Sequence, residues 1–290
     1  AGGNQACGIW HRARPRNLLA RDDAVTTAEV QPEIRPRSSW YMRGPWISIV
    51  SIVMFLLVWF VSAHFAQSRL LPGPGEVLNY VVEESIHGDL IFQLGITLWR
   101  VVAAFVVAMV VGSAVGLLMG ELPAVNRVLD PWLIVLLNVP ALVIIILAYV
   151  WFGLNEWAAI GAVALNKIPN VIVTLREGAR ALDPGLDEMA RAYRMTPWSK
   201  FRNVTMPQLQ PYFATASRTG LSLIWKIVLV VELLGRPNGV GFELHLNFQL
   251  FNVTAILGYT LAFVAVMLAI EYLLVQPFER YTTRWRNKPV

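Results

Sequence analysis

Apolar segments as long as a bilayer is thick dominate this chain after residue 45. The hydrocarbon core of a membrane is about 30 Å thick, so an α-helix needs about 20 apolar residues to cross it. Segments that meet this requirement are 46–65, 97–120, 131–152, 157–175 and 254–275. Hydrophobic residues make up 56% of the chain and charged residues 15%, where a soluble domain carries about 25% charged residues. The sequence therefore predicts an all-α, polytopic membrane protein.

One further segment, 217–235, is apolar apart from Arg218, Lys226 and Glu232. We interpret it as the fifth of six spans in chain order. The six spans together occupy 46–276, the predicted transmembrane domain.

Basic residues concentrate in three regions: the N-terminal part, the segment between the fourth and fifth spans, and the C-terminal part. They include Arg12, Arg14, Arg16, Arg21, Arg35, Arg37, Arg43, Arg176, Arg180, Arg191, Arg194, Lys200, Arg202, Arg280, Arg284, Arg286 and Lys288. The connection 66–96 has Arg69 as its only basic residue. Because positive charge accumulates in cytoplasmic loops, and six spans place these regions on one side, we expect both termini in the cytoplasm.

The two ends of the chain are expected to lie outside the membrane domain. Residues 1–45 mix Arg, Pro and Ala without helical or strand periodicity, which predicts a disordered basic cytoplasmic tail. Residues 277–290 form a second basic tail. The single cysteine, Cys7, has no partner for an internal disulfide.

The second span carries a small residue at every fourth position. These residues are Ala104, Ala108, Gly112, Gly116 and Gly120. Such spacing places them on one ridge of the helix and lets a neighbouring backbone approach closely. We expect this ridge to pack the helix bundle and to have no chemical role.

A charged, amphipathic insert, 178–211, separates the fourth span from the fifth. Asp183 and Thr196 each precede a proline, which is typical of an N-cap followed by the first helical residue. Acidic residues then open the first predicted helix and basic residues close it, as the helix dipole favours. We therefore expect short helices at 184–194 and 197–203, and a break at Pro207 and Pro211 before the fifth span.

The apolar residues of the insert share one surface. They are Leu186, Met189, Ala190 and Tyr193 on the first helix, and Trp198, Phe201 and Val204 on the second. An amphipathic hairpin of this kind could lie on the lipid surface. Paired helices with exposed aromatic residues fit better with docking to a soluble partner.

The residues of the insert resemble a known family. Glu188-Met189-Ala190-Arg191, followed by Met206-Pro207, is similar to the EAA loop of binding-protein-dependent ABC transporter permeases. From about Leu71 to Arg286 the chain also resembles the nitrate/sulfonate/taurine subgroup of that family. The segments concerned are Leu71-Pro72-Gly73-Pro74, Arg100 with Phe105, Asp130-Pro131, Val139-Pro140, Trp151-Phe152-Gly153, Trp225-Lys226, Val231-Glu232-Leu233-Leu234-Gly235, Gly239-Val240-Gly241, Pro277-Phe278-Glu279-Arg280 and Trp285-Arg286.

The resemblance implies a transport subunit of an ATP-driven importer in the bacterial cytoplasmic (inner) membrane, and not an enzyme. Its implied partners are a second permease subunit, expected to be identical, two ATPase subunits that bind ATP and Mg²⁺, and an extracytoplasmic solute-binding protein. This chain itself would hold no cofactor and no metal. The implied solute is a small anion or zwitterion such as nitrate, an alkanesulfonate or taurine, although some relatives carry pyrimidine-type vitamin precursors.

The resemblance also implies which residues dock on the ATPase. They are Asp187, Glu188, Met189, Ala190, Arg191, Tyr193, Arg194, Pro197, Trp198, Phe201 and Pro207. At one of these positions the chain departs from the family, which usually has glycine where this sequence has Arg194. Arginine adopts a left-handed backbone at a cost that glycine avoids. Either the turn is built differently here, or Met195 and Thr196 take up the chain reversal.

Several ionisable residues lie within the predicted spans. Lys226 and Glu232 are candidates to line the solute pathway, since a charge inside the membrane is costly and is usually paired or functional. Lys226 could equally pair with an acid on a neighbouring helix, and Glu232 could extend to the outer interface. Arg100 and Lys167 are interpreted as interfacial anchors near span ends.

Several other functions lack their motifs. The sequence has no G-x-x-x-x-G-K-[ST], H-E-x-x-H or G-x-S-x-G, and its four histidines show no metal-ligand spacing. Basic residues flank apolar segments and form no continuous basic face, which argues against nucleic-acid binding. The alternatives that remain are an ion-coupled secondary transporter, which would need inverted repeats and midplane carboxylates, and a membrane scaffold without transport.

Overall fold

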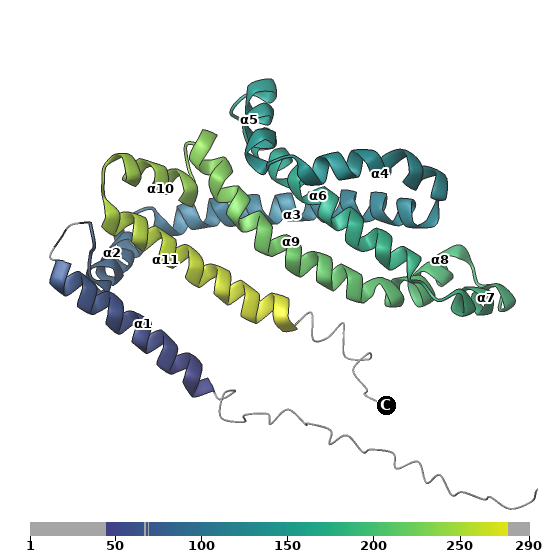
Figure 1. Ribbon diagram of the computed structural model, residues 1–290, viewed down its shortest axis with the longest axis horizontal. Coiled ribbons are helices and arrows are strands. Elements are labelled where there is room, and N and C mark those ends of the chain that lie inside the picture. Colours follow the sequence, from purple (N-terminus) through teal and green to yellow (C-terminus); the bar gives the residue numbers. More distant parts are fainter. Residues whose placement is uncertain (1–44, 67, 69, 278–290) are drawn as a thin grey trace, which may run out of the picture. The chain divides into compact units, whose positions relative to one another are not determined.

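Helices account for every regular element in the part of the chain that the structure describes, residues 45–66, 68 and 70–277 of a computed structural model (Figure 1). Their bounds are α1 Pro45–Ala66, α2 Pro74–His87, α3 Leu90–Glu121, α4 Pro123–Asn138, α5 Ala141–Phe152, α6 Glu156–Arg180, α7 Pro184–Ala192, α8 Pro197–Lys200, the π-helical turn η2 Phe201–Thr205, α9 Met206–Gly235, α10 Val240–Gln249, α11 Val253–Ile270 and η3 Glu271–Val275. The described residues from 51 onward form one compact unit, and the contacts below lie within it. The predicted all-α class is confirmed.

Four of the described helices are long and apolar enough to cross a membrane. They contain Ile49–Ala66, Leu90–Glu121, Glu156–Arg180 and Val253–Leu273. A fifth candidate is the pair α4–α5. At about 1.5 Å per residue, the 30 residues of α9 also exceed the bilayer core, but α9 carries more polar residues. The six-span count and the cytoplasmic location of both termini therefore stay predictions, and the tails 1–44 and 278–290 lie outside the described residues.

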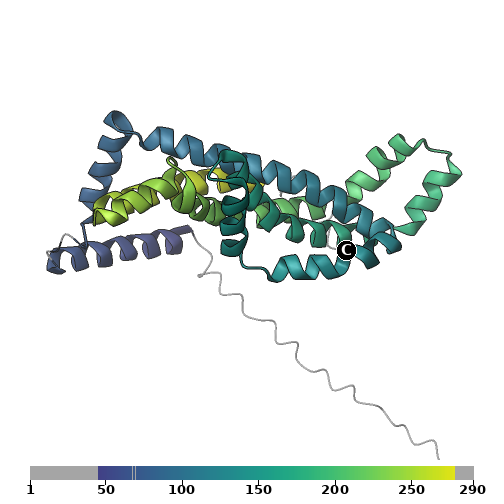
Figure 2. The ribbon, with the colours of Figure 1, turned by 90° about the horizontal axis from the view of Figure 1, so that it is seen from above.

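Helices α3 and α6 share the most extensive contact in the described bundle, and the two run side by side in the views of Figures 1 and 2. The ridge of small residues on α3 makes this possible. A Cβ added at Gly112 would lie 2.7 Å from Cβ of Val171, and one at Gly116 would lie 2.8 Å from the carbonyl oxygen of Ile172. Both distances are shorter than any real contact of this kind, so only glycine permits the observed approach. The predicted packing role of the ridge is confirmed.

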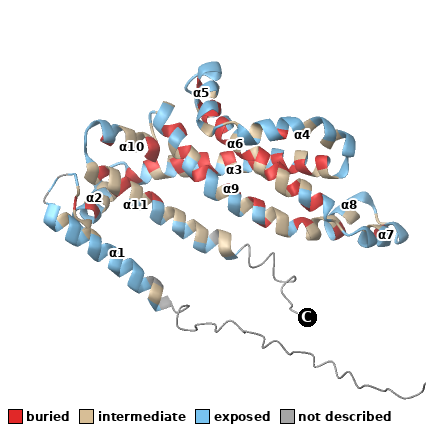
Figure 3. Cartoon of the chain, viewed as in Figure 1, coloured by how far each residue is buried: buried red, intermediate tan, exposed pale blue. Residues whose placement is uncertain are grey.

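Helix α9 lies against α3 and α6, and the three helices hold most of the buried residues (Figure 3). Val163 of α6 and Ile224 and Val228 of α9 are buried in one apolar cluster. Trp225 of α9 meets Phe263 of α11 edge to face, with ring centroids 6.2 Å apart. These contacts place α6, α9 and α11 around a common apolar core.

The predicted third span, 131–152, is not one straight helix. It is divided between α4 and α5, which are bent by 99° at the break. Pro140 has no N–H to bond within a helix, and a residue that precedes proline is driven to an extended backbone. Val139 accordingly has φ −74° and ψ 125°. The apolar run was recognised from the sequence, but its single-helix form was wrong.

The expected break at Pro207 and Pro211 is also wrong. Residues from Pro197 to Gly235 are helical without interruption through α8, η2 and α9. In an α-helix the ring of Pro207 would press against the carbonyl of Asn203, four residues earlier. The π-helical turn Phe201–Thr205 widens the helix immediately before Pro207. The helix therefore continues from the insert directly into α9.

Candidate functional site

The insert between α6 and α9 folds as two capped helices, α7 and α8, beyond the ends of the bundle (Figures 1 and 2). Asp183 Oδ1 accepts a hydrogen bond from the backbone N–H of Gly185 at 2.8 Å, and Thr196 Oγ1 accepts one from that of Ser199 at 3.2 Å. Both predicted N-caps are thus present. Helix α7 ends at Ala192, two residues before the predicted end.

The chain reverses direction at Arg194 itself. Its φ is 49°, in the left-handed region that favours glycine. Backbone bonds support the turn, because the N–H of Arg194 donates to the carbonyl of Arg191 and that of Met195 to the carbonyl of Ala190, each at 3.0 Å. The left-handed residue is therefore Arg194, and neither Met195 nor Thr196 replaces it.

Asp187 connects the two short helices. Its carboxylate forms ion pairs with Lys200 of α8 and with Arg191, one turn further along α7. The hydrogen bond from Lys200, followed by that from Arg191, holds the pKa of the Asp187 carboxyl below its ordinary value. Lys200 was not predicted as a functional residue, although an acid in the first helix and a base in the second are the signal for such a pair.

The apolar side chains of the insert form an exposed patch, which we call the docking surface. It consists of Leu186, Met189, Tyr193, Trp198 and Phe201. Trp198 and Phe201 are stacked, with centroids 6.0 Å apart, and Tyr193 is 78% exposed. Such a concentration of aromatic area on a water-exposed hairpin is typical of an interaction site.

The other predicted docking residues surround this surface or support it. Glu188, Arg191, Arg194 and Pro197 are exposed, and the Glu188 carboxylate has no hydrogen bond or ion pair within the described residues. Ala190 is buried at 1% exposure, and Pro207 is half-buried at the start of α9. Ala190 and Pro207 therefore support the hairpin from within, while the remaining predicted residues are accessible.

In the first half of α3, a buried ionic cluster is centred on Arg100. Its Nε and Nη2 donate to the two oxygens of Glu156 at 2.6 and 3.1 Å. Nη1 donates to Glu232 Oε1 and to the carbonyl of Asn238, both at 2.8 Å, and Nη2 also donates to the Asn238 side chain. All five guanidinium N–H groups thus have acceptors. A second cation, Arg236, pairs with Glu156 at 2.5 Å.

The same cluster holds the loop between α9 and α10. Glu232 Oε2 accepts from Thr97 Oγ1 and from the backbone N–H of Gly241, both at 2.9 Å. Gln93 Oε1 accepts from the N–H of Gly239 at 2.6 Å. Gln93, Thr97 and Arg100 lie on one face of α3 because they are spaced by four and three residues. Side chains from three helices and one loop therefore form a single polar clamp.

These contacts correct two sequence interpretations. Arg100 and Lys167 are each 2% exposed and are not interfacial anchors. Glu232 is 0% exposed, so it neither extends to the outer interface nor lines a surface in this conformation. The sequence reasoning considered each charge along its own helix, whereas the partners of Arg100 come from elements up to 138 residues away.

Lys226, by contrast, lies on an exposed polar face of α9. Thr215, Thr219, Ser222 and Lys226 are exposed and spaced by four, three and four residues, so they form one line that we call the polar stripe. The three hydroxyls donate to backbone carbonyls of their own helix at 2.9, 2.9 and 3.0 Å. Lys226 has no hydrogen bond or ion pair within the described residues. Its ammonium is available to a ligand.

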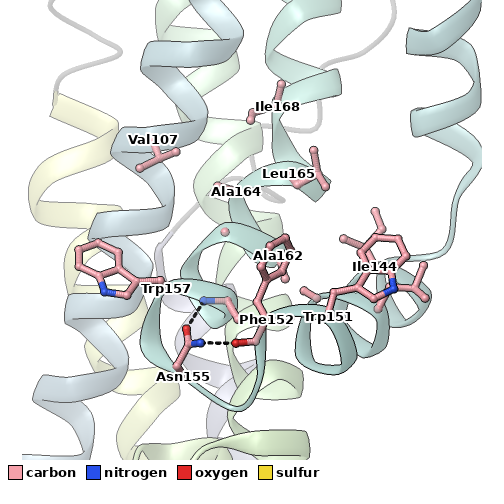
Figure 4. Close-up of a pocket in the computed structure, with 14 residues that line it drawn as sticks. Val107, Ile144, Trp151, Phe152, Asn155, Trp157, Ala162, Ala164, Leu165 and Ile168 are labelled. Carbon is pink, nitrogen blue, oxygen red and sulfur yellow. Dashed lines mark hydrogen bonds between the residues drawn. The ribbon is translucent and has the colours of Figure 1, made fainter.

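A groove of about 620 Å³ lies between α3, α5 and α6 (Figure 4). Val107, Trp151, Phe152, Trp157 and Leu165 are among its apolar walls. Its polar side-chain groups are the amide of Asn155 and the indole N–H groups of Trp151 and Trp157. Both ends of the Asn155 amide are bonded, to the N–H of Ala158 and to the carbonyl of Phe152 (Figure 4). The groove has no charged side chain in its lining and is therefore unsuited to selecting an anion.

Residues 108–276 match the family model described as "Binding-protein-dependent transport system inner membrane component". The match covers more than half of the chain. The chain belongs to this family. It is thus the permease component of an ABC importer, a multi-pass inner-membrane protein and not itself an enzyme, and the resemblance drawn from the EAA-like insert is confirmed.

Curated relatives agree with this assignment. The permease is 31% identical over 253 residues to the putative aliphatic sulfonates transport permease protein SsuC of Escherichia coli, which covers 86% of this chain and 95% of that protein. It is 26% identical over 254 residues to the bicarbonate transport system permease protein CmpB of Synechococcus elongatus, with 83% and 89% covered. The permease belongs to the subgroup that the sequence indicated.

A solved structure confirms the fold of the permease. A chain of the MetNI methionine ABC transporter in an inward-facing conformation superposes with a TM-score of 0.58 at 19% identity, covering 69% of the permease and 98% of that chain. At this level of identity the likeness establishes the arrangement of the helices and not the solute.

Proposed function

We propose that this permease forms, with a second identical copy, the pathway by which a small anion or zwitterion such as an alkanesulfonate, nitrate or taurine enters the cell. ATP and Mg²⁺ bind to separate ATPase subunits, and an extracytoplasmic binding protein delivers the solute. The names of two relatives, which refer to sulfonates and to bicarbonate, support an anion.

The observation that carries the proposal is the polar stripe of α9. If α9 crosses the membrane, a line of three hydroxyls and one ammonium cannot face lipid without a large cost. The polar stripe can instead face a water-filled pathway or the polar surface of another subunit. Lys226 is the one member of the stripe whose polar group has no partner in the described residues, and a free ammonium attracts an oxyanion. We therefore propose that Lys226 lines the solute pathway.

The proposed coupling runs from the docking surface to α9. The docking surface contacts the ATPase, and α8 continues through η2 into α9 without a break. The start of α9 is held against the end of α6, since a Cβ at Gly178 would lie 2.7 Å from the ring of Tyr212. Closure of the ATPase pair on ATP would then move α6 and α9 as rigid bodies, with both chain termini on the cytoplasmic side.

Co-purification tests the docking surface. We expect the intact permease to retain its ATPase subunits in detergent, and Glu188→Ala with Tyr193→Ala to lose them, because both side chains are exposed on the insert. Arg127→Ala on α4 is the matched control, since it also removes an exposed charge. If the docking variants retain the ATPase and transport like the wild type, the insert is not the docking element.

Transport kinetics test Lys226. Replacing Lys226 by Met should raise the KM for the anion roughly tenfold, the equivalent of one charge-assisted contact of about 1.4 kcal/mol, while ATPase retention stays unchanged. An unaltered KM would mean that Lys226 does not contact the solute.

A further inference from the structure

Lys167 lies at the centre of the three packed helices. Lys167 of α6, Phe105 of α3 and Gly220 of α9 are neighbours, and each lies near the middle of its helix (Glu156–Arg180, Leu90–Glu121 and Met206–Gly235). Each is at least 11 residues from either end, which corresponds to about 16 Å along the axis. Lys167 is therefore deep in the predicted membrane domain and far from both interfaces.

The Lys167 ammonium has no partner among the residues that the structure describes. The residue is 2% exposed, and it makes no hydrogen bond or ion pair within residues 45–66, 68 and 70–277. Helix α3 has no acid between Arg100 and Glu121. On its own helix the nearest acid is Glu177, 10 residues or about 15 Å away.

The acids of the other neighbouring elements are also occupied. Glu232 of α9 is 12 residues from Gly220, about 18 Å along the helix, and it binds Arg100. Glu271 of η3 pairs with Arg218 at 3.7 Å. Of the helices that pack around Lys167, none therefore supplies its counter-charge in this conformation.

Packing does not explain a lysine at this position. An unpaired ammonium in an apolar helix junction costs several kcal/mol, whereas methionine would fill the same space without that cost. Gly220 makes room for the side chain, because a Cβ there would lie 3.1 Å from Lys167 Cε and 3.9 Å from Nζ. The space at Gly220 therefore accommodates a charged side chain that packing alone does not require.

We propose that Lys167 binds the oxyanion of the solute in the middle of the membrane, in a conformation in which α9 has moved away from α6 at Gly220. In the conformation described here, α9 covers the ammonium. Lys226 lies six residues from Gly220, about 9 Å along α9 but on the exposed face of that helix, so the two lysines would bind the anion at different stages. This inference rests on the proposed transport function and assigns its deeper binding site.

Substitution tests this site in proteoliposomes that hold the permease, its ATPase and its binding protein, with ethanesulfonate as the probe. Lys167→Met should lower ethanesulfonate uptake per ATP hydrolysed by about tenfold or more, with a thermal midpoint equal to or above that of the wild type. Lys167→Arg should retain most of the uptake because it keeps the charge. Wild-type uptake by Lys167→Met, or a lowered thermal midpoint that shows a structural role, would overturn the proposal.

Cysteine labelling tests the site without depending on which solute the wild type carries. The sequence has one cysteine, Cys7, so Lys167→Cys in a Cys7→Ser background has a single thiol. We expect water-soluble methanethiosulfonates to react with it while the ATPases turn over and not at rest. The aminoethyl reagent should restore the function lost in Lys167→Cys, and the methyl reagent should not. A thiol that stays unreactive throughout turnover, or equal rescue by both reagents, would overturn the site. Labelling only during turnover together with no sulfonate uptake by the wild type would instead contradict the proposed solute.

Discussion

At the scale of single residues, the charges inside the helix bundle fall into two classes. Arg100 has an acceptor for every guanidinium N–H, whereas Lys167 and Lys226 have none in the described part of the chain. A paired buried charge holds elements together, and an unpaired one is available to a ligand. The distinction depends on contacts across the fold and could not be drawn from one helix at a time.

Replacing Arg100 by Met should destabilise the permease by about 3–5 kcal/mol, because it leaves the buried carboxylate of Glu232 without its cation. Thermal unfolding in detergent measures the effect. The double variant Arg100→Met, Glu232→Met should recover part of the loss, since neither charge is then left alone. A single variant that melts with the wild type would mean that the clamp does not stabilise the fold.

The titration of Glu243 on α10 should make the stability of the permease depend on pH. Its carboxylate accepts a hydrogen bond from Gln93 at 3.1 Å. Burial, and then the nearby Glu84 and Asp89, raise the pKa of its carboxyl. The folded state therefore holds a proton that the unfolded chain releases above about pH 4.3, so this contribution is present at lower pH and is lost as the pH rises through the raised value.

Thermal midpoints measured from about pH 4 to pH 7 check this expectation. The wild type should lose stability as the pH rises across that range, and Glu243→Gln should lose less because glutamine stays neutral. Identical pH profiles for the two proteins would show that Glu243 titrates normally.

At the scale of elements, close packing of α3 on α6 was predictable because the small residues recur with helical spacing. A substitution tests this contact directly. Gly116→Val should destabilise the permease by about 1–3 kcal/mol, since its Cβ would lie 2.8 Å from a backbone oxygen that cannot move aside easily.

Gly161→Ala on α6 is the matched control, because a Cβ there meets nothing within 4 Å. Thermal unfolding should find this control close to the wild type or slightly more stable, as alanine favours a helix over glycine. If both substitutions have equal effects, the contact between α3 and α6 is not the reason for the glycine at 116.

The effect of each proline on its helix was the hardest feature of the elements to predict. Pro140 breaks the helix between α4 and α5, whereas Pro207 lies in a continuous helix because a π-helical turn precedes it. The local sequences contain a proline in both places, and the outcome depends on whether the preceding turn can widen. Arg194 is a similar case. The sequence indicates that the turn needs a left-handed residue, but it does not show that Arg194 itself adopts φ 49°.

At the scale of the whole molecule, the all-α class, the capped insert and the family followed from segment length, cap residues and motif order. The clamp around Arg100 did not, because its members are far apart in the sequence and only the fold brings them together. The number of spans also depends on more than composition. Helix α9 is long enough to cross the membrane, but its polar stripe makes it less apolar than a lipid-facing span.

The central claim is that this permease moves an anion with energy from ATP. It is tested most directly by uptake of labelled ethanesulfonate into proteoliposomes that contain the permease, its ATPase and its binding protein. We predict uptake that requires hydrolysable ATP and the binding protein, and that continues after proton and sodium gradients are abolished. Uptake by the permease alone, driven by an ion gradient and indifferent to ATP, would contradict this account and would identify a secondary transporter.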